Sequence, residues 1–156
     1  MVKIGDLAPD FILLDEDGKQ KKLAEYKGKW VLLYFYPKDD TPGCVKEACG
    51  IRDGFPSFKK TGLNVLGVSI DSVESHKNFK KKYKLPLTLL SDSEKKVVSA
   101  YGVWGKKKFM GKEYFGTHRT SFLIDPQSKI RKIYEEVNPE THTEEVLKDI
   151  SALTKE

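Results

Sequence analysis

Two cysteines, Cys44 and Cys49, directly follow a run of turn-forming residues in this chain. Thr41 is a good helix N-cap and Pro42 a good first helical residue, so we expect a helix that begins at Pro42. Cys44 would then lie in the first turn, where unpaired backbone N–H groups and the helix dipole favour an anion. A thiolate is such an anion, and it is the nucleophilic form of cysteine. The spacing therefore predicts a reactive thiol at Cys44.

Cys49 is out of bonding reach of Cys44 as long as the helix is intact. It would lie about 500° of rotation and about 7.5 Å of rise beyond Cys44. The two Cα atoms would then be about 8–9 Å apart, whereas a disulfide needs about 7 Å or less. Either the two cysteines never bridge, or the first turns of the helix unwind when they do. Gly43 and Gly50 would ease such an opening.

Other interpretations of the two cysteines stay open at this point. Both could be small buried side chains in a helix core. A zinc site fits less well, because C-x4-C is not a standard ligand spacing and the histidines are distant in sequence. A thiolate at Cys44 would also be opposed by Asp39 and Asp40 if they pointed inward. A cation from elsewhere in the chain would then be needed.

The elements that must position these cysteines alternate between apolar runs and helical patterns. The patterns predict a hairpin over 11–23, a buried strand over 31–36, a helix over 42–60 interrupted at Gly54 and Pro56, a strand over 64–70, a helix over 72–83, a strand over 87–90, a helix over 93–101, a hairpin over 120–135, and a helix over 141–153 with Thr141 and Glu144 as a capping box.

This order predicts an α/β chain with a thioredoxin-like fold, in which helices flank a central mixed sheet and an N-terminal β-hairpin extends it. The 156 residues suit one domain over 1–156. Functional sites in such sheets gather at the carboxyl ends of strands. The strand over 31–36 would deliver the cysteine segment to that edge.

Composition narrows the classes of function. The formal charge is +5, but the lysines are interleaved with acids, and their densest cluster, over 77–84, fits the solvated face of a helix. We therefore expect neither nucleic acid nor a membrane as partner, although a basic binding module stays an alternative. Two cysteines are too few for a disulfide scaffold, and the first residues lack a signal-peptide pattern, so we expect a cytoplasmic protein.

The segment 34–49, YFYPKDDTPGCVKEAC, resembles the active-site signature of the peroxiredoxins, most closely that of the bacterioferritin-comigratory protein or peroxiredoxin Q subfamily. The family pattern Pro-x-x-x-Thr-x-x-Cys is matched by Pro37, Thr41 and Cys44. Further matches, at 5–11, 67–69 and 119–125, extend the resemblance over nearly the whole chain.

The resemblance implies that Cys44 attacks a peroxide and becomes a sulfenic acid, with release of water or an alcohol. Thr41 would hydrogen-bond the peroxide and the sulfur, and Pro37 would shield the pocket from water. Arg119 would be the required cation, stabilising the thiolate and the transition state. Glu47, one helical turn after Cys44, could hold a cation in place or could be a solvated helix residue.

The resemblance also implies that Cys49 resolves the sulfenic acid as an intramolecular Cys44–Cys49 disulfide, which thioredoxin or a similar dithiol reduces. Hydrogen peroxide is the expected substrate, with organic hydroperoxides as further candidates. We expect a monomer, with no cofactor and no metal. The rival enzyme class is a thioredoxin-like disulfide oxidoreductase, which would usually carry C-x-x-C.

Overall fold

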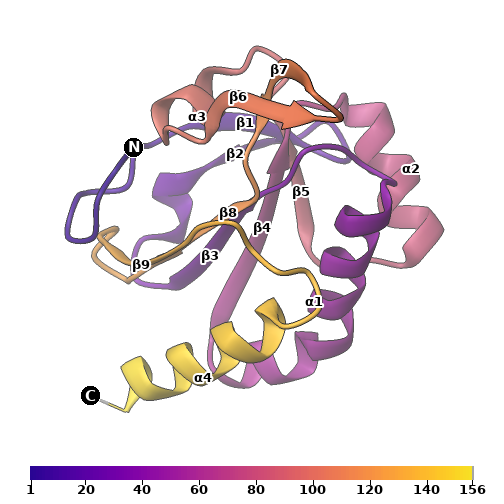
Figure 1. Ribbon diagram of the computed structural model, residues 1–156. Coiled ribbons are helices and arrows are strands. Elements are labelled where there is room, and N and C mark those ends of the chain that lie inside the picture. Colours follow the sequence, from indigo (N-terminus) through magenta and orange to yellow (C-terminus); the bar gives the residue numbers. More distant parts are fainter. Residues whose placement is uncertain (156) are drawn as a thin grey trace.

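The computed structural model describes residues 1–155 and contains a central sheet of seven strands in the order β2-β1-β5-β4-β3-β8-β9 (Figure 1). Strands β3, β4 and β5 are parallel, and the other neighbours pair antiparallel. The strands of this sheet are β1 (Ile12–Asp15), β2 (Gln20–Lys22), β3 (Trp30–Phe35), β4 (Leu63–Ser69), β5 (Thr88–Ser91), β8 (Thr120–Ile124) and β9 (Ile130–Tyr134). The mixed sheet and the N-terminal hairpin confirm the predicted thioredoxin-like architecture.

Within residues 1–155, four α-helices cover the two faces of the sheet (Figure 1). Helices α1 (Pro42–Lys60), α2 (Val73–Tyr83) and α4 (His142–Thr154) share one apolar cluster with the sheet. Helix α3 (Lys96–Ala100) shares the other cluster with the opposite face. A short 3-10 helix (Leu23–Tyr26) follows the N-terminal hairpin. Burial on both faces explains why the central strands are continuously apolar in sequence.

Strand β3 leads to the candidate site at the carboxyl end of the parallel strands. Five of its six residues are buried, as the unbroken apolar run predicts. Alternate side chains fill the two clusters: Leu32 and Tyr34 lie on the α1 side, and Leu33 and Phe35 on the α3 side. A short loop leads from β3 into α1 at the carboxyl end of the strand.

Helix α1 is continuous over 42–60, so the predicted interruption at Gly54 and Pro56 is wrong. A proline inside a helix costs about 3 kcal/mol. Packing outweighs this cost, because Ile51 and Phe58 on either side of Pro56 are 1% and 0% exposed. Gly54 is a packing position, since an added Cβ would lie 2.6 Å from a methyl group of Thr143 on α4.

A second, two-stranded sheet was not predicted. Strands β6 (Trp104–Phe109) and β7 (Lys112–Thr117) form a hairpin with its turn at Met110 and Gly111, both at positive φ. Glycine readily adopts the positive φ that this turn requires at Gly111. Methionine rarely adopts a positive φ, so Met110 is an unusual residue at the other turn position. The strands are largely exposed and lack alternating apolar residues, so the sequence carries little strand signal there.

Two helix starts also differ from prediction. Thr141 has a helical backbone, and its side chain caps no N–H group among the described residues, so the capping box with Glu144 does not form. The helix predicted over 93–101 shortens to α3. Asp92 explains this start, because its carboxylate accepts hydrogen bonds from the N–H groups of residues 96, 97 and 98.

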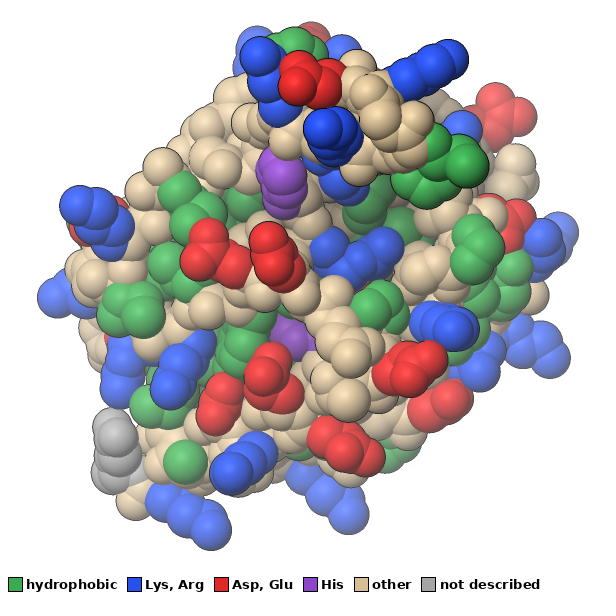
Figure 2. Space-filling model, viewed as in Figure 1, with side chains coloured by type: hydrophobic (Ala, Val, Ile, Leu, Met, Phe, Trp, Pro, Cys, Tyr) green, Lys and Arg blue, Asp and Glu red, His purple; other side chains and the backbone are tan. Residues whose placement is uncertain are grey.

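Within the described part of the chain, no helix combines the length and apolarity needed to span a membrane. Basic and acidic side chains are interleaved over the face seen in Figure 2, with no separation by sign. This pattern matches the charge distribution in the sequence and gives no support on that face to a basic binding surface.

Candidate active site

Cys44 is the third residue of α1 and lies in its first turn, as predicted. The first helical hydrogen bond runs from the Val45 N–H to the Thr41 carbonyl oxygen at 2.8 Å. The Cys44 side chain is only 2% exposed and belongs to the apolar cluster under α1. An anion at Cys44 Sγ would therefore face the positive end of the helix dipole in a low-dielectric environment.

Arg119 is the cation beside Cys44. Its Nη2 lies 3.4 Å from Cys44 Sγ, and its Nη1 donates to Glu47 Oε1 at 2.8 Å. The backbone carbonyl of Arg119 accepts a hydrogen bond from the Val137 N–H, which fixes the segment between β7 and β8. Thus Arg119 bridges two side chains of the first helical turns, and Glu47 is a buried partner of Arg119, not a solvated helix residue.

Gly43 makes this approach of Arg119 possible. A Cβ atom at position 43 would lie 2.9 Å from Arg119 Nη2, closer than real Cβ atoms come to their neighbours. The glycine before Cys44 therefore leaves room for the guanidinium group. The sequence marks Gly43 only as a flexible position, and its space-making role becomes visible once Arg119 is placed.

Burial dominates the electrostatics of Glu47. It raises the pKa of the Glu47 carboxyl group to about 7, although the charge and hydrogen bond of Arg119 act in the opposite direction. Glu47 Oε2 is buried and has no hydrogen-bond partner among the described residues. The carboxyl group therefore titrates near neutral pH, next to the guanidinium group that contacts Cys44.

Thr41 and Pro37 both belong to the loop between β3 and α1. The Thr41 hydroxyl donates to the Lys38 carbonyl oxygen at 2.9 Å, which leaves the lone pairs of its oxygen available as acceptors. Thr41 is at the N-cap position, but its hydroxyl bonds the loop and caps no described helical N–H group. Pro37 is half-buried two residues after β3.

Cys49 lies further along the same unbroken helix and is half-buried. Both cysteines are free thiols. The continuity of α1 through positions 44 and 49 reproduces the geometry that keeps the two sulfurs out of bonding reach.

The carboxylates of Asp39 and Asp40 are both bonded to groups other than Cys44. Asp39 is bonded to residues 36, 75 and 76, and Asp40 to residues 82 and 83 of α2. Both carboxylates therefore engage partners on the α2 side of the loop. Of the three residues predicted to assist the thiol, Arg119 contacts Cys44 from the β7–β8 connection, and Thr41 and Pro37 lie in the loop before α1.

Lys107 is a second cation near the site that the sequence did not indicate. Its Nζ donates to the Thr117 carbonyl oxygen at 3.0 Å, two residues before Arg119. Burial and the charge of Arg119 lower the pKa of Lys107, while Cys44 acts to raise it. The sequence patterns did not predict the hairpin that carries Lys107. They therefore could not predict that this lysine lies near Cys44.

Comparison with known proteins places the chain in a family. A model of the AhpC/TSA family matches residues 4–133. The peroxiredoxin Bcp of Escherichia coli K12 is 48% identical over 146 residues, which cover 94% of each protein. The peroxiredoxin Bcp of Bacillus subtilis is 44% identical over 154 residues, or 99% of this chain and 98% of that one.

A solved structure agrees with this placement. The bacterioferritin comigratory protein of Xanthomonas campestris, described for its alkyl peroxide reduction activity, superimposes with a TM-score of 0.90 at 33% identity. The alignment covers 99% of this chain and 98% of the other. With a thioredoxin-like sheet and a buried thiol at a helix N-terminus beside an arginine, the fold and site are those of a thiol peroxidase.

The chain belongs to the AhpC/TSA family and, within it, to the peroxiredoxins of the Bcp and peroxiredoxin Q group. Its activity is that of a peroxidase that uses a cysteine thiol, with a peroxide as substrate and a thiol as reductant.

Proposed function

We propose that Cys44 is the peroxidatic cysteine and that Thr41, Arg119 and Pro37 assist it. The Cys44 thiolate attacks one peroxide oxygen, an S–O bond forms, and the O–O bond breaks. The sulfur is oxidised to a sulfenic acid. The second oxygen leaves with the bonding electrons and takes up a proton, as water or an alcohol. Negative charge moves from sulfur to this oxygen, so donors fixed beside both atoms lower the barrier.

The observation that carries this proposal is the contact of Arg119 with Cys44. A guanidinium nitrogen 3.4 Å from Sγ supplies a fixed positive charge at the atom that must ionise. Arg119 cannot lose its proton under ordinary conditions, so this charge is permanent. The acceptor lone pairs of Thr41 and the half-buried ring of Pro37 support the roles of binding the peroxide and limiting access of water.

Cys49 completes the cycle in this proposal. Its thiolate attacks the sulfur of the Cys44 sulfenic acid, an S–S bond forms, and the sulfenic oxygen leaves as water. The first turns of α1 must unwind for this step, because the intact helix holds the two sulfurs apart. A dithiol such as thioredoxin then reduces the disulfide by exchange.

Both hydrogen peroxide and organic hydroperoxides are proposed substrates. The alkyl peroxide reduction described for the Xanthomonas campestris relative supports the second class. Thioredoxin dependence is tested by NADPH consumption with thioredoxin, its reductase and each peroxide in turn. Turnover with thioredoxin is the expected result, whereas turnover only with a small thiol such as dithiothreitol would contradict this part of the proposal.

The two cysteine roles are separated by single-turnover measurements on the reduced protein. Cys44→Ser should consume no peroxide. Cys49→Ser should still consume one equivalent and then stop at the sulfenic acid, which dimedone labels. Loss of the first turnover in Cys49→Ser would show that the roles are wrongly assigned.

A cytoplasmic, monomeric protein remains our proposal for cellular setting and assembly. Light scattering after size exclusion, on reduced and oxidised protein, tests the monomer. A dimer in both states would contradict it.

A further inference from the structure

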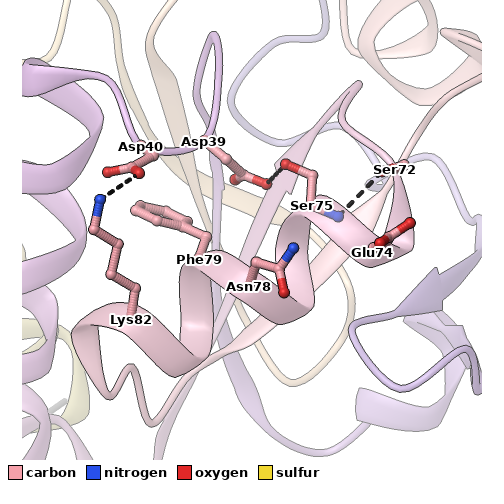
Figure 3. A pocket seen from close by; sticks show the side chains of 8 residues that line it. All are labelled: Asp39, Asp40, Ser72, Glu74, Ser75, Asn78, Phe79 and Lys82. Carbon is pink, nitrogen blue, oxygen red and sulfur yellow. Dashed lines mark hydrogen bonds and ion pairs between the residues drawn. The ribbon is translucent and has the colours of Figure 1, made fainter.

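Two consecutive aspartates tie the β3–α1 loop to helix α2. Figure 3 shows the side chains of Asp39 and Asp40 directed toward α2, where they bond Ser75 and Lys82. The pocket in this view is lined by both aspartates and lies on the α2 side of the loop. The loop leads directly into the first turn of α1, which carries Cys44.

His76 is the buried centre of this arrangement, with no exposed surface. Its Nε2 lies 2.9 Å from the Leu90 carbonyl oxygen, which can only accept, so Nε2 carries a proton. Its Nδ1 lies 2.6 Å from Asp39 Oδ2, within hydrogen-bond distance. The ring is therefore fixed at both nitrogens, one to strand β5 and one to the loop.

The Asp39 carboxylate has additional donors. Tyr36 Oη donates to Oδ1 at 2.6 Å, and Ser75 Oγ donates to Oδ2 at 2.8 Å. The backbone N–H of Asp39 donates to Asp71 Oδ2 at 2.9 Å. A buried polar network in which the members are satisfied in this way is rigid, because every alternative position leaves a buried group unpaired.

Asp40, the next residue of the loop, is bonded to α2 at the protein surface. Its carboxylate accepts hydrogen bonds from Tyr83 Oη at 2.5 Å and from Lys82 Nζ at 2.7 Å. Its backbone has a φ of 56°, in the left-handed region. This conformation costs a non-glycine residue about 1 kcal/mol or more, so the surrounding contacts must hold it.

One atom each of Asp39, Asp71 and His76 lies within 4.8 Å of the others, a spacing that could also suit a metal ion. These atoms, however, already bond donors or acceptors of the protein itself. A metal ion would have to displace those bonds. We therefore interpret the cluster as a set of hydrogen bonds that connects the loop to α2, and not as a metal site.

We propose that His76 is a positioning residue: together with Asp39 it clamps the loop before α1 and thereby controls how often the first turn of α1 unwinds. Helices open from their ends, and the first hydrogen bond of α1 starts at Thr41, directly after the clamped residues. A held loop favours the wound form, in which Cys44 contacts Arg119. The consequence for resolution rests on the proposed Cys44–Cys49 disulfide.

Hydrogen exchange on the reduced protein tests the clamp without any disulfide. In His76→Leu the amides of residues 45–48, which donate the first hydrogen bonds of α1, should exchange about tenfold faster or more, while those of β4 and α4 keep their rates. The matched control is Asn78→Ala, on an exposed position of the same helix in the same pocket, which should leave all rates unchanged. Rates in His76→Leu within about twofold of the wild type would overturn the proposal.

A second variant decides the matter if His76→Leu loosens the whole protein. Replacing Lys82 by Met and Tyr83 by Phe removes the surface bonds to Asp40 and leaves the buried cluster intact. It should accelerate exchange at residues 45–48 by about threefold, with the rest of the molecule unchanged. No acceleration there would overturn the clamp.

Peroxide-treated samples then connect the clamp to resolution. In His76→Leu the Cys44–Cys49 disulfide should form several-fold faster after sulfenic acid formation, by rapid quenching and mass spectrometry, about in proportion to the exchange rates. Faster exchange with no disulfide even in the wild type would refute the proposed resolving step and leave the clamp standing. If the disulfide forms at the same rate in His76→Leu and in the wild type although exchange is faster in the variant, the clamp does not control resolution. The effect of the clamp on helix opening would still stand.

Discussion

At the scale of single residues, Arg119 joins the two titratable groups that the site depends on. Its guanidinium group contacts Cys44 Sγ on one side and Glu47 on the other. The family motif indicates the first contact, whereas the second follows only from the structure, since an acid in a helix is exposed far more often than buried. The side chain of Glu47 is 1% exposed, so its charge is stable only because Arg119 is there.

Arg119→Met should lower kcat/KM for peroxide by roughly 100- to 1000-fold, because a fixed charge aimed at the reacting atoms is lost. The rate of Cys44 alkylation by iodoacetamide at a fixed pH should fall, since the sulfur loses its neighbouring cation. Stopped-flow peroxide reduction and the alkylation rate measure the two effects. Arg131→Met serves as the control, and an unchanged alkylation rate in Arg119→Met would argue against contact between charge and thiol.

Glu47 should make stability fall as the pH rises through neutrality. An unfolded glutamate ionises with a pKa of about 4.5, whereas in the folded protein burial raises the Glu47 pKa to about 7. The folded state therefore binds more protons than the unfolded state between these values, and raising the pH favours unfolding. Relative to Glu47→Gln, the wild type should lose on the order of 2 kcal/mol between about pH 5 and about pH 8.

Urea unfolding of the reduced proteins measures this difference. Comparison with Glu47→Gln isolates Glu47, because His142 titrates in the opposite sense. Burial lowers the pKa of His142 to about 4, so its contribution is lost as the pH falls below about 6.5. The control is Glu74→Gln at an exposed position of α2. If the difference in the free energy of unfolding between the wild type and Glu47→Gln stays constant with pH, the predicted effect is refuted.

At the scale of elements, the proposed mechanism requires helix α1 both to hold Cys44 rigidly and to open at its start. Its N-terminal turn contains Pro42 and Gly43, and His76 of α2 bonds Asp39 in the loop before it. Its later part is fixed by Ile51 and Phe58 in the core and by packing on α4. The opening proposed for resolution therefore belongs to the turns between Pro42 and Cys49, and the rest of α1 stays in place.

Gly43→Ala should slow peroxide reduction without preventing the fold. The added methyl group would clash with the Arg119 guanidinium group at 2.9 Å, and displacing a catalytic group by about 1 Å can cost about 100-fold. Gly50→Ala is the matched control, because its methyl group meets the tip of the Thr143 side chain at 3.3 Å, away from the site. Equal single-turnover rates for the two variants would contradict the space-making role of Gly43.

At the scale of the whole molecule, the sequence predicts the parts whose signals are local. The apolar run of β3, the Thr41–Pro42 helix start and the position of Cys44 all follow from short patterns. The course of α1 past Pro56 depends on packing against distant elements, which local propensity does not contain. The same holds for Lys107, which approaches the site only because an exposed hairpin, with little apolar alternation, folds back toward Arg119.

Oxidation should make the whole molecule less stable. The buried side chains of Cys44, Ala48 and Ile51 hold the first half of α1 in the main cluster, and unwinding withdraws part of this surface from the core. A disulfide that closes so short a loop restricts the unfolded chain only modestly. Thermal unfolding should therefore give a lower Tm for the oxidised than for the reduced protein, by several degrees. A higher Tm after oxidation would indicate that the disulfide forms without unwinding.

The most direct test of the mechanism is peptide mass spectrometry of wild-type protein treated with one equivalent of hydrogen peroxide. We expect the peptide containing Cys44 and Cys49 to lose two hydrogen atoms, and we expect no covalent dimer. Disulfide-linked dimers, or a Cys44 that proceeds to sulfinic acid while Cys49 stays a free thiol, would contradict the proposal that α1 opens to let Cys49 resolve Cys44.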